Sequence, residues 1–298
     1  MAYVYILVAV LLWALLGIFA KFAFKSGLLP LEVAFWRATL GAVFFWVHAK
    51  LTGSMFPKGR DLLLTLAFGL TGVSLFYSSY QWSVFYGGAG WASVLLYTAP
   101  AFVALYFAFT GAERLSLWGW LAILVTLVGV ACLSLPGGSA VGGPALFWGI
   151  LSGLSYALYY PYGKAFFHRY PAGGLYALAL STGAVGLAPW VHFSQKSPEA
   201  WLYLGLIAFA STYLAYLAYS EAMRRLPAIL VSVLATLEPA VAYLLAIFLW
   251  GESLSVPGFL GASLILGAAV WSAVQSFKVG GPKSKSTKSL EVPLQPDR

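Results

Sequence analysis

Charged residues are scarce in this chain: they make up 9% of its 298 residues, whereas hydrophobic residues make up 61%. Average soluble domains carry about 25% charged residues, so this composition cannot cover a water-exposed surface. Cysteine is nearly absent as well. The single Cys132 excludes an intrachain disulfide, and its apolar segment offers neither partners for a metal cluster nor a base for a thiol nucleophile. We therefore expect no metal and no cofactor.

Motifs for hydrolytic or ATP-driven chemistry are missing too. The sequence contains no phosphate-binding loop and no long polar segment that would drive primary transport. His48, His168 and His192 lie far apart near the ends of apolar segments, which argues against a membrane-embedded enzyme. The net charge of +8 does not indicate nucleic-acid binding, because the basic residues lie in short loops and in the C-terminal tail.

Long apolar segments are what the chain has in abundance. A membrane-spanning helix needs about 20 predominantly apolar residues, and clusters of Gly, Pro and Ser separate segments of this length. We predict an all-α integral membrane protein whose partners are the lipid bilayer and a small-molecule substrate. Its ten transmembrane helices are expected at residues 3–22, 33–51, 62–84, 88–110, 117–135, 145–167, 174–193, 200–222, 228–250 and 256–277.

One stretch of the sequence occurs twice. Residues 93–121 return as residues 232–260, 139 positions later and without a gap, and twelve of the 29 aligned pairs are identical. Pro100 and Pro239 are one of these pairs, and we expect them to act as hinges in their helices. Each copy holds five predicted spans, so the second copy must lie inverted in the membrane.

The same shift pairs Tyr77 with Tyr216, so the repetition extends toward the N-terminal side of each copy. We predict a 5+5 inverted-topology repeat with a first unit at residues 1–138 and a second at residues 142–277. Residues 279–298 are expected to form a disordered basic tail that can touch anionic lipid. Inverted repeats are typical of alternating-access transporters that bind substrate near the membrane midplane between the units.

Lysine and arginine predict the orientation, because cytoplasmic loops retain them. With the N-terminus inside, the inner loops and the tail hold thirteen basic residues: Lys50, Lys58, Arg60, Arg114, Lys164, Arg169, Arg224, Arg225, Lys278, Lys283, Lys285, Lys288 and Arg298. The outer side receives three: Lys21, Lys25 and Lys196. We therefore expect a multi-pass protein of the cell inner membrane with both termini in the cytoplasm.

Two equivalent segments resemble the signature of a known family. Residues 113–130 and 252–267 each begin with Glu-x-Leu-Ser and continue with Gly and a helix of small residues. This pattern resembles that of EamA-type transporters of the drug/metabolite transporter superfamily. The resemblance covers residues 1–277 and implies ten helices in a 5+5 inverted repeat. Glu113 and Glu252 are expected to cap the turns that follow them.

The resemblance also implies an activity. Family members export amino acids and other metabolites, and some move nucleotide sugars or phosphorylated sugars. The aromatic content of 17% makes the chain similar, in particular, to aromatic amino-acid exporters of the YddG type. We expect a secondary exporter of amino acids, with a sugar-phosphate, nucleotide-sugar or broad drug/metabolite carrier of the same fold as the alternative. Highly charged sugars would require several buried cations, and Arg37 is the one candidate in the sequence.

Polar and aromatic residues at mid-span positions are the candidate binding residues. Hydrocarbon offers polar groups no partners, so they should point inward, toward water or toward one another. Mid-span aromatic rings are not explained by interfacial belts, and their faces can attract an ammonium group. The predicted substrate-binding residues are Trp13, Tyr77, Ser78, Gln81, Ser93, Tyr97, Trp148, Ser155, Tyr159, Tyr216 and Glu238. For any one of them, helix–helix hydrogen bonding is the competing interpretation.

Two charged residues leave alternatives open. Glu238 lies about ten residues into its span, where a charge costs at least about 2.5 kcal/mol. It either faces a cavity, as a substrate-ammonium contact or a proton carrier, or is a neutral acid bonded to a carbonyl that Pro239 frees. Arg37 lies close to Glu32 in the sequence. It is either a paired interface residue or a ligand for a substrate carboxylate.

Overall fold

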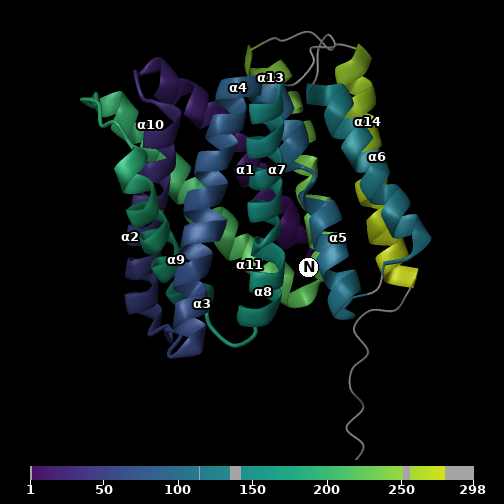
Figure 1. Cartoon of the computed structure of the whole chain (residues 1–298), viewed down its shortest axis with the longest axis horizontal. Coiled ribbons are helices and arrows are strands. Elements are labelled where there is room, and N and C mark those ends of the chain that lie inside the picture. Colours follow the sequence, from purple (N-terminus) through teal and green to yellow (C-terminus); the bar gives the residue numbers. More distant parts are fainter. Residues whose placement is uncertain (1, 114, 135–141, 251–255, 279–298) are drawn as a thin grey trace, which may run out of the picture.

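The computed structural model describes residues 2–113, 115–134, 142–250 and 256–278, and these residues form helices without any strand (Figure 1). Glu252 and the predicted tail lie outside the described residues. The helical elements are α1 (Ala2–Lys25), α2 (Pro30–Thr52), α3 (Arg60–Phe68), η1 (Gly69–Leu75), α4 (Phe76–Leu96), α5 (Ala99–Thr110), α6 (Leu117–Ser134), α7 (Gly143–Ala157), α8 (Tyr159–Phe166), α9 (Ala172–Leu187), η2 (Ala188–Trp190), α10 (Pro198–Ala208), η3 (Phe209–Leu214), α11 (Ala215–Arg225), α12 (Ala228–Ala235), α13 (Leu237–Trp250) and α14 (Val256–Lys278).

Four predicted spans appear as unbroken helices. The bounds of α1, α2, α6 and α14 agree with the predicted ones to within three residues. Local chemistry explains such ends: α2 begins at Pro30, where a missing N–H costs nothing, and ends at Gly53 with φ +61°. Seven described segments are long and apolar enough to cross a membrane, and Leu117–Cys132 is a shorter apolar helix. The described chain is therefore consistent with a multi-pass membrane protein.

Other predicted spans are interrupted helices. The π-helices η1 and η3 each join two α-helices, α3 to α4 and α10 to α11, and their last residues lie 139 positions apart. Further breaks follow Leu96, Ala157 and Ala235. Two of these breaks directly precede the predicted hinges, Pro100 in α5 and Pro239 in α13, because proline cannot bond the carbonyl four residues earlier.

The chain folds back within α4, although helical structure continues through residues 85–87, between the predicted spans 62–84 and 88–110. Ser83 and Leu95 both lie against Gly149 of α7. Twelve residues of a straight helix would separate them by about 18 Å, so the segment reverses direction between them. The sequence correctly places a reversal here, but a helical turn makes it rather than an open loop.

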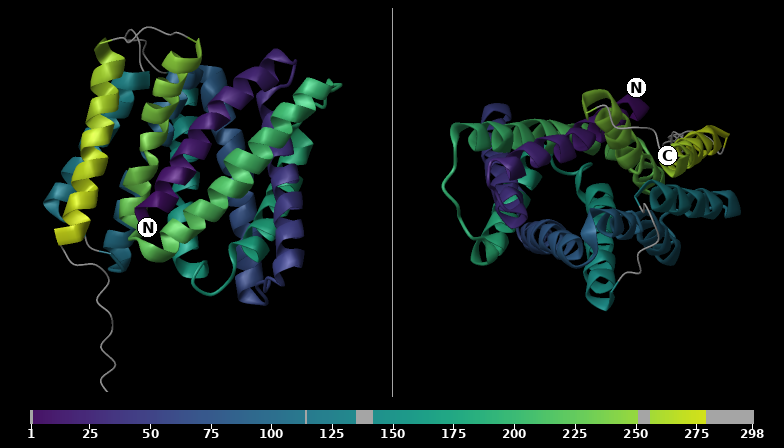
Figure 2. Two further views of the ribbon diagram at one scale, coloured as in Figure 1. Left: turned by 180° about the vertical axis from the view of Figure 1, so that it is seen from behind. Right: turned by 90° about the horizontal axis from the view of Figure 1, so that it is seen from above.

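The helices pack in pairs that join distant parts of the chain. α2 lies along α9, α4 along α7, and α6 along α14 at one edge of the molecule (Figure 1), while α1 runs beside α10 and α11 on the far side (Figure 2). Small residues permit the close approach of α6 and α14: a side chain on Gly129 would lie 2.9 Å from the carbonyl oxygen of Gly261. These two Gly-containing helices therefore pack on each other within one chain.

Candidate functional site

A cavity of about 370 Å³ lies among α1, α2, α4, α7, α8, α11 and α13. Its wall combines aromatic rings with a few polar groups and two charged residues. The residues that line it are Trp13, Leu16, Gly17, Ala20, Phe24, Pro30, Val33, Ala34, Arg37, Phe76, Tyr77, Tyr80, Gln81, Val84, Ser93, Leu96, Tyr97, Tyr156, Tyr159, Tyr216, Tyr219 and Glu238. An apolar pocket of this size with few convergent polar groups is the usual form of a small-molecule site.

The structure brings most of the sequence-predicted binding residues together at this wall. Those that line the cavity are Trp13, Tyr77, Gln81, Ser93, Tyr97, Tyr159, Tyr216 and Glu238. Three others do not line it: Ser78, Trp148 and Ser155. Ser78 donates its hydroxyl to the backbone oxygen of Ser74 at 2.7 Å, within its own helix. Trp148 packs beside Trp82, and Ser155 is buried within the helix packing of α7.

Three tyrosine hydroxyl groups meet at the floor of the cavity. The hydroxyl of Tyr216 on α11 lies 3.1 Å from that of Tyr77 on α4 and 3.1 Å from that of Tyr159 on α8. Tyr219, one turn further along α11, donates to the backbone oxygen of Tyr159 at 3.1 Å. Trp13 packs against Tyr216 and Tyr219 from α1. The floor is thus a continuous aromatic surface with its hydroxyl groups held in fixed positions.

Arg37 of α2 is the cation of the cavity wall. Its Nε donates to Thr212 Oγ1 at 2.9 Å, and its guanidinium carbon lies 4.7 Å from the centre of the Tyr77 ring. The hydroxyl of Thr212 itself donates to the carbonyl of Ile207, five residues earlier in the π-helical segment. Across the described residues, Arg37 takes part in no ion pair. Its terminal amino groups are therefore not satisfied by a carboxylate in the described part of the chain.

Glu238 is the carboxylate of the same wall. It lies in the first turn of α13, directly after the break at Thr236, and its carboxyl group is in hydrogen-bonding contact with the hydroxyl of Tyr97. The partial positive charge at a helix N-terminus favours a carboxylate there. Among the described ion pairs, none includes Glu238. Thus one cation and one anion face the cavity without joining each other.

The cavity reaches only one end of the helix bundle. Its wall follows α1 from Trp13 to Phe24 and α2 from Pro30 to Arg37, so it extends toward the end where α1 passes into α2. We call this end the open end. The Glu32 carboxylate, near this end, accepts hydrogen bonds from the backbone N–H and the hydroxyl of Ser194.

Glu32 pairs with Lys196 and not with its sequence neighbour Arg37. The Lys196 Nζ lies 2.6 Å from Glu32 Oε1, and both side chains are buried. The aromatic rings of Trp36 and Trp201 lie beside the lysine. Because this pair ties α2 to the loop before α10, Arg37 is left to face the cavity.

The opposite end of the bundle is closed by contacts between distant segments. The rings of Phe68 and Tyr162 stack with centroids 3.9 Å apart, and the Tyr162 hydroxyl donates to Thr65 Oγ1 at 3.1 Å. Nearer the surface, Asp61 of α3 accepts from the guanidinium of Arg169 and from the hydroxyl of Tyr170. We call this end the closed end.

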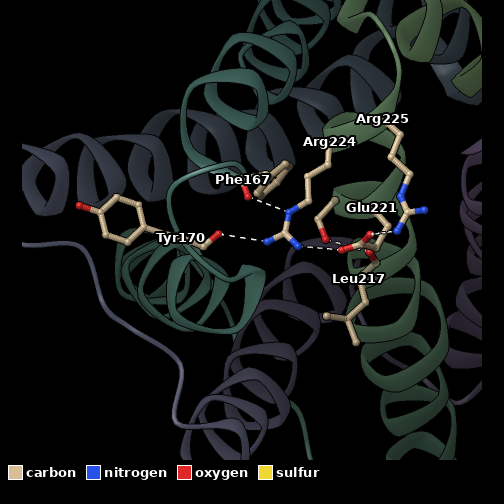
Figure 3. A network of polar contacts seen from close by, with 7 residues as sticks. Phe167, Tyr170, Leu217, Glu221, Arg224 and Arg225 are labelled. Atoms are coloured by element: carbon tan, nitrogen blue, oxygen red, sulfur yellow. Dashed lines mark hydrogen bonds and ion pairs between the residues drawn. The ribbon is translucent and has the colours of Figure 1, made fainter. Parts of the chain in front are cut away.

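A network around Arg224 completes the closed end (Figure 3). Arg224 donates to the backbone oxygens of Phe167 at 2.7 Å and Tyr170 at 3.3 Å, and it pairs with Glu221 at 2.8 Å (Figure 3). Glu221 also pairs with Arg225. Glu221 thus forms a salt-bridge pair at the end of α11, and Arg224 also fastens α11 to the segment after α8.

Glu113 caps a distant helix and not the turn that follows it, which corrects the sequence expectation. Its two carboxylate oxygens accept from the backbone N–H groups of Ala228 at 2.8 Å and Ile229 at 3.1 Å, at the start of α12. The Lys164 Nζ lies 3.5 Å away. Pro227, at the N-cap position of this helix, has no polar side-chain atom and cannot cap it. A residue between α5 and α6 therefore satisfies backbone donors more than a hundred positions later.

Close packing accompanies the break before Pro100. Thr98 donates its hydroxyl to the Leu95 carbonyl at 2.6 Å, and Gly153 of α7 lies directly against both groups. A side chain on Gly153 would lie 2.6 Å from each of the two oxygens. The glycine thus lets α7 touch a stretch of backbone whose helical hydrogen bonding proline interrupts.

Sequence reasoning missed most of the contribution of α2 to the wall. Pro30, Val33 and Ala34 line the cavity beside Arg37, the one residue of this span that the sequence offered as a possible substrate ligand. The available signal was an arginine within an apolar span, since such a charge normally faces protein or water. Tyr80, Tyr156 and Tyr219 also join the wall.

Comparisons with known proteins agree with this architecture. The sequence model of the EamA-like transporter family matches residues 1–135 and 143–274. The chain is 25% identical to an uncharacterized inner membrane transporter, YicL, of Salmonella typhimurium, covering 91% of this chain and 94% of the relative. It is 28% identical to an uncharacterized transporter of Archaeoglobus fulgidus, covering 85% and 92%, respectively.

Two further matches bear on function and fold. A probable terminal-alkyne amino-acid exporter of Streptantibioticus cattleyicolor is 28% identical, covering 72% of this chain and 73% of the relative. One crystal structure superposes with a TM-score of 0.79 at 19% identity, covering 94% of this chain and 99% of that one, and shows a shared fold. The family match extends over both halves of the chain. The protein is a member of the EamA-like transporter family.

Proposed function

We propose that the protein is a secondary transporter that exports amino acids or similar small metabolites by alternating access. The observation that carries this proposal is the cavity: it has aromatic walls, reaches one end of the bundle and is shut at the other by stacked rings and ion pairs. A cavity accessible from one end only is what one state of an alternating-access cycle requires. Rocking of the two halves would open the closed end and shut the open one.

An inverted repeat of residues 1–138 and 142–277 is supported by which elements meet. Tyr77 and Tyr216, which lie 139 positions apart, touch through their hydroxyl groups. α2 packs on α9 and α6 packs on α14, and each helix lies beside the one that the repeat makes its counterpart. Contacts between counterparts are expected where a two-fold axis passes. Prolines that follow the two helix breaks, Pro100 and Pro239, are the proposed hinges.

The distribution of Lys and Arg supports an orientation with both termini in the cytoplasm. The closed end then lies on the cytoplasmic side and the open end faces outward, so the structure corresponds to an outward-facing state. We place the protein in the inner membrane, as the name of the YicL relative does for that protein.

Aromatic or other apolar amino acids are the substrates that the wall fits best. Among the described residues, seven tyrosines and one tryptophan line the cavity, and their rings can stack on an apolar side chain and attract an ammonium group. A sugar-phosphate or nucleotide-sugar substrate is less well supported, because Arg37 is the one cation among the lining residues. One relative bears the name of an amino-acid exporter, which agrees with this assignment.

Energy for export would come either from the substrate gradient or from exchange of a proton. Glu238 is the residue through which proton exchange would occur, since it is the one carboxylate among the lining residues. When protonated it would release a bound ammonium group, and when ionised it would hold one. Both coupling schemes use the same cavity.

Efflux from loaded proteoliposomes tests this function. Vesicles containing the purified protein would be loaded in turn with labelled phenylalanine, tryptophan, leucine, glucose 6-phosphate and UDP-glucose. We expect release of the amino acids above the rate of empty vesicles, and slower release from a Tyr216→Ala variant. Tyr106→Ala is the matched control, because Tyr106 lies exposed on α5 away from the cavity. Release of the sugars but not of the amino acids would overturn the proposal.

A further inference from the structure

The cavity wall carries two charged groups that do not form an ion pair with each other. Arg37 and Glu238 line one cavity, yet no nitrogen–oxygen pair between them lies within the 4.0 Å of an ion pair. Each is held by neutral partners, Arg37 by Thr212 and Glu238 by Tyr97. A buried charge without a counter-ion is costly. A ligand with one positive and one negative end would compensate both at once.

We infer that the cavity is built for a zwitterion: Arg37 binds the carboxylate of an α-amino acid and Glu238 binds its ammonium group. The inference rests on the proposed function, because it assigns the substrate class of that cavity. Guanidinium groups recognise carboxylates through two parallel hydrogen bonds. The single bond from Nε to Thr212 orients the guanidinium, so its remaining donors stay available to a ligand.

The aromatic rings of the wall form the surface on which the substrate side chain would lie. The rings of Tyr77, Tyr97, Tyr156 and Phe76 line the same cavity as the two charged residues. Tyr77 lies beside Arg37, Tyr97 contacts Glu238, and Phe76 packs on Tyr77 and Tyr156. An apolar side chain that enters this space displaces water from aromatic surface. Selection of a zwitterion thus comes from the charges, and preference among amino acids comes from the rings.

Three ligands that share one phenyl ring separate the roles of the two charges. Phenylalanine carries both charges, phenethylamine lacks the carboxylate, and 3-phenylpropionate lacks the ammonium group. Binding to the purified protein in detergent is measured from the ligand-dependent rise of the unfolding midpoint. We expect phenylalanine to bind at least about tenfold more tightly than either analogue, because each analogue leaves one buried charge unpaired.

Variants assign each preference to its residue. Arg37→Gln should remove the preference for phenylalanine over phenethylamine and keep the preference over 3-phenylpropionate. Glu238→Gln should do the reverse. Arg60→Gln and Glu199→Gln are the matched controls, since both residues are exposed outside the cavity. If Arg37→Gln does not fold, Arg37→Lys keeps the charge without the paired donors, and it should weaken phenylalanine binding while sparing phenethylamine.

The outcomes separate this inference from the proposed function. Equal binding of the three ligands by the wild type overturns the zwitterion site, as does a variant that weakens all three alike. Failure of phenylalanine, tryptophan and leucine to bind overturns it too. Tight, charge-selective binding without efflux from vesicles supports the site and refutes the transport activity. Efflux of phenethylamine in preference to phenylalanine refutes the site and leaves transport standing.

Discussion

Removal of the Glu113 carboxylate should destabilise the protein through a helix that lies in the other half of the chain. Glu113 accepts two backbone N–H groups at the start of α12, at 2.8 and 3.1 Å, and no other side chain caps that helix. Loss of a helix cap costs about 1 kcal/mol, and loss of a negative charge at a helix N-terminus costs up to about 1 kcal/mol more. We expect Glu113→Ala to lose about 2 kcal/mol.

Thermal unfolding in detergent, followed by intrinsic fluorescence, measures this loss. For chains of 150–250 residues about 1 kcal/mol corresponds to a shift of about 2–4 °C, and the shift becomes smaller as the chain lengthens. For this chain of 298 residues the midpoint should therefore fall by about 3 °C. Because large membrane proteins unfold irreversibly, all variants must be heated at one scan rate. Glu113→Gln retains one acceptor oxygen and should lose about half as much.

Two controls isolate the cap. Glu199→Ala removes the same residue type from the first turn of α10, where Ser197 already caps the helix by accepting from Ala200, and it should change the midpoint little. Lys164→Ala removes the 3.5 Å ion pair with Glu113 and the 3.3 Å hydrogen bond to the Leu226 carbonyl. Because this lysine is partly exposed, its loss should cost under about 1 kcal/mol. Equal midpoints for Glu113→Ala and Glu199→Ala would refute the capping argument, and an equal loss from Lys164→Ala would assign the effect to the contacts of the lysine.

Three further predictions concern packing, topology and coupling. Gly153→Ala should cost about 1–3 kcal/mol of stability in thermal unfolding, because its methyl group would lie 2.6 Å from two oxygens at the α4–α5 break. Gly205→Ala is the control: Gly205 faces open space, so this change should not destabilise the protein. Cysteines placed at Ser139 and at Ser286 should react with impermeant reagents from opposite faces of the membrane; labelling of both from one face would contradict the inverted repeat. Glu238→Gln should lose any acceleration of efflux by a pH gradient and still exchange substrate for substrate at saturation, because an amide cannot release a proton; an unchanged response in vesicles would limit Glu238 to ligand binding.

Much of the candidate site followed from the sequence because hydrocarbon restricts where polar groups can lie. Mid-span Tyr77, Tyr97, Tyr159 and Tyr216 could face neither lipid nor an interfacial belt, so an inward position was the remaining choice, and all four line the cavity. The same restriction left two interpretations open for Glu238, and the structure places it on the cavity wall. Apolar length likewise predicted α1, α2, α6 and α14 to within three residues.

Only the tertiary structure shows which charged groups pair when the partners lie far apart in the sequence. Arg37 and Glu32 are near neighbours in the sequence, but Glu32 forms its ion pair with Lys196. Arg37 instead bonds Thr212 and lines the cavity. The carboxylate of Glu113 accepts hydrogen bonds from backbone N–H groups of α12 and not from the turn that follows it. Each of these choices depends on the energy of long-range contacts, which local propensity does not contain.

The sequence by itself determined that the chain must enter a membrane and that its halves are related, since composition and a gapless repetition are properties of the string of residues. Only the folded chain decided that the cavity opens at one end and is shut at the other. That outcome depends on which aromatic rings stack, as Phe68 does on Tyr162. It also depends on how distant helices meet the breaks, as where Gly153 of α7 lies directly against the Leu95 carbonyl and the Thr98 hydroxyl before Pro100.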